Sequence, residues 1–73
     1  MKDNIKNALN TLEKHAQRSR LEIANLEDIL KTCRTDFERQ YTQENIETEK
    51  RLLNITLEQI EVTKQLLQDE KIQ

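Results

Sequence analysis

His15 and Cys33 are the only candidates in this sequence for a nucleophile, an imidazole base or a soft metal ligand. They are 18 residues apart, which on one helix separates them by ~27 Å. Within one subunit they can neither form a catalytic pair nor share a metal ion. The chain has no glycine, so it has no glycine-rich phosphate loop. We therefore expect no enzyme, no cofactor and no metal site, and we interpret the two residues as a surface histidine and a packed, structural thiol.

The densest basic stretch is residues 14–20 (KHAQRSR). Glu13 and Glu22 flank it, and no aromatic residues are interleaved for stacking on bases. The whole chain carries 12 Lys and Arg against 14 Asp and Glu, a balance that creates no strong field for nucleic acid or an anionic membrane. We interpret the stretch as a solvated helix face and expect no nucleic-acid partner.

The chain of 73 residues contains neither glycine nor proline, which predicts an almost wholly helical protein. Its first half carries a seam with alternating spacings of four and three residues, in which only Ser19 is polar. This coiled-coil-like pattern predicts a helix over about residues 3–37. The seam consists of Ile5, Leu9, Leu12, Ala16, Ser19, Ile23, Leu26, Leu30, Cys33 and Phe37.

The second half carries two apolar stripes on different faces of one helix. The Ile46 stripe consists of Ile46, Leu53, Leu57, Ile60 and Leu67. The Leu52 stripe consists of Leu52, Ile55, Val62 and Leu66. A helix that is apolar on two faces needs two neighbours, and the first helix supplies only one. We expect the Ile46 stripe, with its more regular heptad spacing, to face the first helix and the Leu52 stripe to bind a partner; the reverse assignment stays open.

A break is predicted within residues 34–45, which contain two possible helix starts. Residues 35–38 (TDFE) fit a capping box, and residues 42–45 (TQEN) are a looser version. A turn here predicts a single-domain, all-α, two-helix antiparallel hairpin over residues 1–73, with the second helix at about 43–71. The partner or dimerisation would complete the fold.

One uninterrupted helix of ~110 Å is the alternative. It requires a four-residue stutter between Phe37 and Tyr41 and extends the seam to Leu66. We favour the hairpin because the continuous helix leaves the Ile46 stripe without a role.

A domain this small buries only about 60% of its unfolded surface, and a single cysteine cannot form a disulfide within a monomer. The chain therefore relies on a partner, either another protein or its own copy. The polar N-terminus is not followed by an apolar segment, and no stretch approaches the ~20 apolar residues of a membrane span. We expect a cytoplasmic protein without membrane insertion.

Several segments resemble a known family: residues 26–34 (LEDILKTCR), residues 40–41 (QY) and residues 49–53 (EKRLL), followed by Ile55, Leu57 and Ile60. Over about half its length, the chain resembles the small needle-subunit co-chaperones of type III secretion systems (the YscE, PscE and EscE type). The resemblance implies a cytosolic bacterial virulence protein that folds as a hairpin, docks on a helical-repeat chaperone and keeps the needle subunit from polymerising early. It places Tyr41 near the start of the second helix.

From the apolar patterns we expect a non-enzymatic protein-interaction module, and the resemblance implies that it is such a co-chaperone. The expected partner-binding residues are Leu52, Ile55, Val62, Leu66 and Tyr41. The alternative is a homodimeric four-helix bundle with a structural role, or with an RNA-binding regulatory role through its basic face.

Overall fold

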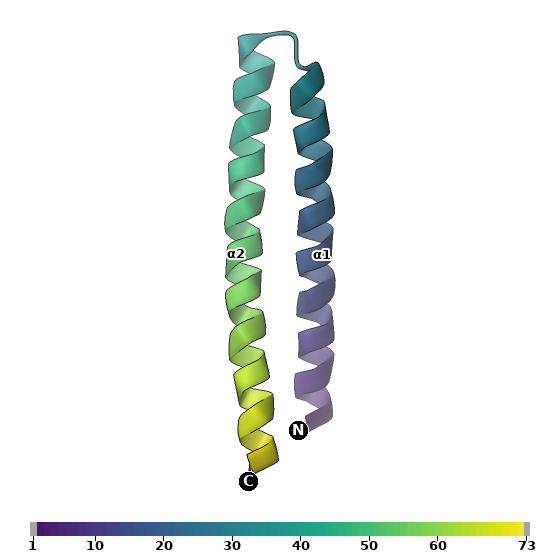
Figure 1. Cartoon of the computed structure of the whole chain (residues 1–73), viewed down its shortest axis with the longest axis vertical. Coiled ribbons are helices and arrows are strands. Elements are labelled where there is room, and N and C mark those ends of the chain that lie inside the picture. The colour runs from purple at the N-terminus through teal and green to yellow at the C-terminus, as the bar shows by residue number, and fades with distance from the viewer. Residues whose placement is uncertain (1, 73) are drawn as a thin grey trace.

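A computed structural model of the chain describes the backbone of residues 2–72 and the side chains of residues 3–69. It contains helix α1 (Lys2–Thr32) and helix α2 (Asp36–Ile72). The two helices lie side by side and antiparallel (Figure 1), in a rod of 58 × 14 × 12 Å. The chain is thus an all-α, two-helix antiparallel hairpin, as the sequence predicts, and the continuous helix is wrong.

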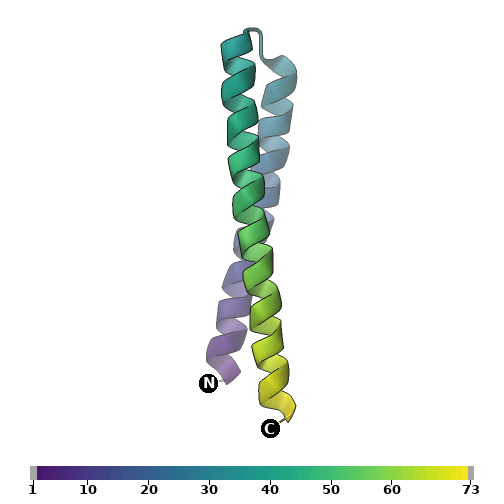
Figure 2. The same cartoon turned by 90° about the vertical axis from the view of Figure 1, so that its left-hand side faces the viewer.

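The predicted seam of α1 forms one side of the interface between the helices. Every seam position from Ile5 to Cys33 is buried or half-buried, and every other described side chain of α1 is exposed. The Ile46 stripe forms the other side, where Ile46 is only 2% exposed. On α1, Ala16 is also 2% exposed, and it lies near Leu57 and Ile60 of this stripe. The helices cross at a shallow angle (Figure 2), as expected for a seam that repeats every seven residues.

The turn is made by residues 33–35 and is held by the predicted capping box. The backbone N–H of Glu38 donates to the Thr35 hydroxyl at 3.0 Å, and the Glu38 carboxylate accepts the N–H of Arg34 at 3.3 Å. No residue in the described part of the chain has a positive φ. The hairpin therefore turns without the left-handed residue that usually calls for glycine.

The helix boundaries differ from the expected ones near this turn. The first helix ends at Thr32 instead of continuing to about residue 37, and the second begins at Asp36 instead of about residue 43. The turn starts at Cys33, one residue before the predicted window. The capping box at residues 35–38 prevails because it satisfies two backbone N–H groups with side chains.

Two residues near the turn have other roles than predicted. Phe37 was expected on the seam, but the chain leaves α1 before it, and its side chain is 78% exposed in the first turn of α2. Thr42 begins no helix. It is buried inside α2 at 5% exposure, and its hydroxyl lies 3.6 Å from the Cys33 sulfur. Cys33 closes the seam at the turn end, where its sulfur also lies 3.3 Å from the Ile29 carbonyl oxygen.

Candidate protein-interaction surface

The structure separates the two apolar stripes of α2. The members of the Ile46 stripe are buried or half-buried against α1, with Ile60 at 7% exposure. In the Leu52 stripe, Leu52 and Ile55 are 48% and 51% exposed, and Val62 and Leu66 are 61% and 51% exposed. The expected division is confirmed as far as α1 is concerned: α1 covers the Ile46 stripe and leaves the Leu52 stripe open.

Two aromatic residues extend the open stripe towards the turn. Tyr41 is 61% exposed, and its ring stacks on that of Phe37 with centroids 6.5 Å apart and an interplanar angle of 15°. Glu44, Thr48 and Gln59 occupy the intervening positions, and all three are exposed. The result is one stripe along the length of α2, which we call the outer face. Its large apolar members are Phe37, Tyr41, Leu52, Ile55, Val62 and Leu66.

Phe37 is the residue of this face that the sequence patterns misplaced. The signal that would have found it is the four-residue step from Phe37 to Tyr41, which continues at helical spacing to Leu66. Once the capping box at residues 35–38 is taken as the helix start, Phe37 belongs to the second helix and to this stripe.

A groove between the two helices runs beside the outer face. Ala8, Leu12 and His15 of α1 line one wall, and Ile55 and Val62 of α2 line the other. Closer to the turn it continues as a more polar depression, lined by Ser19 and Glu22 of α1 and by Leu52 of α2, among others. Small side chains such as Ala8 and Ser19 leave room for an approaching helix. Three apolar residues of the outer face, Leu52, Ile55 and Val62, therefore border a shared surface of α1 and α2.

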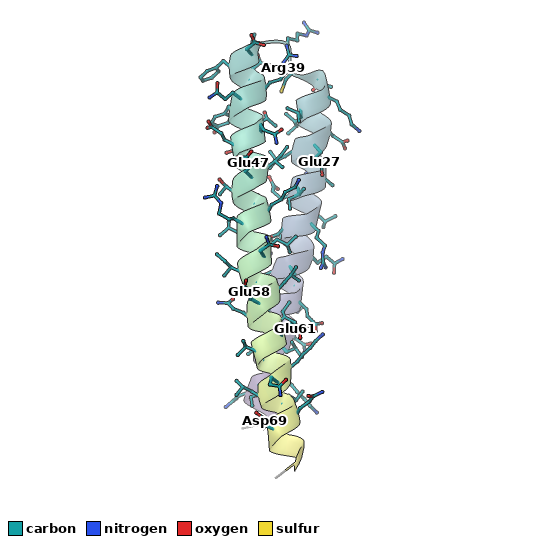
Figure 3. All side chains as sticks on the ribbon, turned by 60° about the vertical axis from the view of Figure 1, so that its left-hand side comes forward. Glu27, Arg39, Glu47, Glu58, Glu61 and Asp69 are labelled. Atoms are coloured by element: carbon teal, nitrogen blue, oxygen red, sulfur yellow. The ribbon has the colours of Figure 1, made fainter. Side chains whose placement is uncertain are left out.

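Charged side chains border the outer face and do not form a single-sign patch. Glu47, Arg51 and Glu58 follow its edge along α2, and Figure 3 shows Glu47 and Glu58 projecting from that helix. The arginines of the basic stretch of α1 lie on different faces of that helix. Arg18 lines the depression beside the outer face, whereas Arg20 lines a separate depression together with Leu57 and Ile60. The two arginines thus lie on different sides of the hairpin.

The structure does not bring the chemically reactive residues together. His15 is exposed on α1, and Cys33 lies half-buried beyond the end of that helix. Within the side chains described, residues 3–69, no group of three or more His, Cys, Asp or Glu is placed to hold a metal ion. In the described part of the chain, neither helix is long and apolar enough to cross a membrane.

Comparison of the chain with protein-family models, curated proteins and solved structures found no match.

Proposed function

We propose that this chain is a non-enzymatic protein-interaction module that binds a helical surface of another protein through the outer face. One observation carries the proposal: six large apolar side chains, each about half exposed or more, share one stripe of α2. From residue 37 to residue 66 this stripe is ~44 Å long at 1.5 Å per residue. An uncovered apolar stripe of this length promotes aggregation, so a binding role explains it better than chance.

The mode of binding follows from the groove beside the outer face. A partner helix laid along it contacts α2 through Ile55 and Val62 and α1 through Ala8 and Leu12. Completing the burial of the four half-exposed aliphatic side chains contributes ~3–6 kcal/mol, half the value for full burial. Association costs of ~4–15 kcal/mol oppose this gain. The aromatic pair and the groove walls must therefore also take part in a stable complex.

The resemblance to the small co-chaperones of type III secretion supplies the specific form of the proposal. In that form the chain docks on a helical-repeat chaperone in the bacterial cytoplasm, and the pair keeps a needle subunit soluble. The hairpin fold supports this form, since the resemblance implies a hairpin. Tyr41, Ile55, Val62 and Leu66, which the resemblance and the stripe pattern place at the docking site, are all exposed.

Co-purification tests both levels of the proposal. The chain is co-expressed with a helical-repeat chaperone and a needle subunit of one type III secretion system, and the soluble complex is isolated by gel filtration. We expect a ternary complex that Ile55→Asp disrupts. Leu21→Asp is the matched control, because Leu21 is 64% exposed on α1 and lies outside the outer face.

Two results would contradict the proposal at different levels. If the chain binds neither protein, the co-chaperone form is wrong. If a complex forms and survives Ile55→Asp but not Leu21→Asp, the outer face is not the binding surface.

A further inference from the structure

The outer face is nearly palindromic in its spacing. Its nine positions from the turn onwards are separated by 4, 3, 4, 4, 3, 4, 3 and 4 residues. When the order of the positions is reversed, each position falls within one residue of a position of the original set. Two copies of α2 that pack antiparallel about a two-fold axis therefore bring every position of one stripe opposite a position of the other. The positions are Phe37, Tyr41, Glu44, Thr48, Leu52, Ile55, Gln59, Val62 and Leu66.

We propose that, in the absence of another partner, the outer face is covered by a second copy of this chain, with the two α2 helices antiparallel and the two-fold axis between residues 51 and 52, so that Leu52 of each copy lies beside the axis. In this register the aromatic end of each helix covers the aliphatic end of the other. Phe37 lies opposite Leu66 of the second copy, and Tyr41 lies opposite Val62. Of the polar positions, Glu44 lies opposite Gln59, whose amide can donate to the carboxylate, and Thr48 lies opposite Ile55.

The exposed area suffices for such a dimer. At roughly 200 Å² for each large side chain, the exposed fractions of the six apolar residues correspond to about 700 Å² on each copy. Two faces thus supply up to roughly 1,400 Å², within the range of ~1,200–2,000 Å² for specific interfaces. The paired helices are already formed and already packed on α1, so little further ordering is needed.

Other registers cover less of the face. Sliding one helix by a heptad towards its C-terminus places Phe37 past Ile72, where α2 ends, and Val62 opposite Thr48. Sliding it by a heptad the other way places Leu66 opposite Leu30, a position that belongs to α1 and not to α2. In both cases one apolar end of the stripe loses its counterpart. The symmetric register with Leu52 beside the axis alone pairs both ends.

This inference uses the surface to which the proposed function also assigns the partner. The dimer and the partner complex then exclude each other, and the partner must separate the two copies before it binds. Self-association protects the apolar stripe from water while the chain is free. The same protection lowers the apparent affinity for the partner as the concentration of the chain rises.

Cross-linking of single cysteines tests the register. In a Cys33→Ser background, Leu52→Cys places one thiol of each copy beside the axis, where a short bis-maleimide reagent joins them. Gln59→Cys is the control, because it lies on the same exposed face but ~22 Å from its counterpart in this register. We expect a covalent dimer from the Leu52→Cys chain and at least tenfold less from the Gln59→Cys chain. Sedimentation equilibrium of the unmodified chain should give the dimer mass at micromolar concentration.

Two outcomes would overturn the inference. A monomer mass up to the highest soluble concentration shows that no second copy covers the face. Equal cross-linking of the two cysteine variants shows that the register is different. Neither outcome affects the co-purification test of the proposed function, which is made with the mixed proteins. Conversely, failure of the co-purification with a confirmed dimer would leave the second copy as the occupant.

Discussion

Two matched double variants distinguish the inner and the outer surfaces of α2. Ile55→Asp with Val62→Asp changes the outer face, and Leu53→Asp with Ile60→Asp changes the Ile46 stripe. Both pairs introduce two carboxylates seven residues apart on the same helix. They differ in exposure, since Ile55 and Val62 are 51% and 61% exposed and Ile60 is 7% exposed. Any difference in stability therefore reports on the packing against α1 and not on the amino acids introduced.

The inner pair should unfold the hairpin. Truncating one buried aliphatic side chain costs about 2–5 kcal/mol, and the carboxylate left in its place adds a desolvation cost of several kcal/mol. A small domain has a total stability near the lower end of ~5–15 kcal/mol. The core is thin, with Ala16, Ile23, Ile46 and Ile60 as its buried apolar residues among those described. The free-energy cost of losing one of these four, together with the change at Leu53, exceeds the total stability expected of the hairpin.

The outer pair should leave each hairpin folded. Removing a half-buried aliphatic side chain costs about 1 kcal/mol, half the value for full burial. Each new carboxylate also lies three or four residues from Glu58, which adds ~0.2–0.5 kcal/mol of repulsion. The total is about 2–3 kcal/mol, or a drop of roughly 10–20 °C in Tm for a domain of this size. Loss of the proposed dimer lowers Tm further, by an amount that depends on the protein concentration.

Circular dichroism at low temperature, followed by thermal melting, measures both variants. We expect the outer variant to keep the helical spectrum of the parent chain and to melt cooperatively at a lower temperature. The inner variant should show little helix at any temperature. If the inner variant keeps its spectrum while the outer one loses it, the helix packing described above is wrong. If both remain helical, the interface between the helices contributes less to stability than its burial indicates.

Three further predictions concern the turn and the surface. Cys33→Ser should leave helix content and partner binding unchanged and lower Tm only slightly, because the hydroxyl keeps a contact with Thr42; loss of function with unchanged folding would indicate thiol chemistry. Thr35→Ala removes the capping hydroxyl and should cost about 1 kcal/mol, seen as a Tm lower by ~4–8 °C. Arg18→Gln with Arg20→Gln should not alter partner binding; an RNA complex that this double variant abolishes, and that weakens steeply with salt, would contradict it.

The sequence predicts the hairpin because its local signals agree with one another. The seam of α1 from Ile5 to Cys33 is buried as its spacing requires, and the Ile46 stripe packs against it. Helical periodicity reports directly on which side chains face inward, so these features follow from the sequence alone. The exposure of the Leu52 stripe follows as well, because a two-helix chain has no third helix to cover it.

The turn was harder to predict because two capping signals compete within a few residues. Phe37 continues the seam spacing, and this spacing favours a first helix that extends past Thr35. The two hydrogen bonds of Glu38 instead stabilise a turn at residues 33–35. The apolar periodicity does not show where the second helix starts, because that position depends on which individual backbone N–H groups find acceptors at the helix end. Misplacing the turn then removed Phe37 from the candidate surface.

The thin core and the long outer face are two consequences of one arrangement. Two helices can bury only the stripe that each presents to the other, so the second stripe of α2 stays in water however well the hairpin folds. A substitution that made one position of the outer face polar would remove apolar exposure at a cost of about 1 kcal/mol to the hairpin, because these side chains are about half exposed or more. The chain instead carries two aromatic and four aliphatic side chains there. Their placement on one stripe, with spacing that matches its own reversal to within one residue, is what we expect of the proposed surface, covered in use by a second copy or by another helical protein.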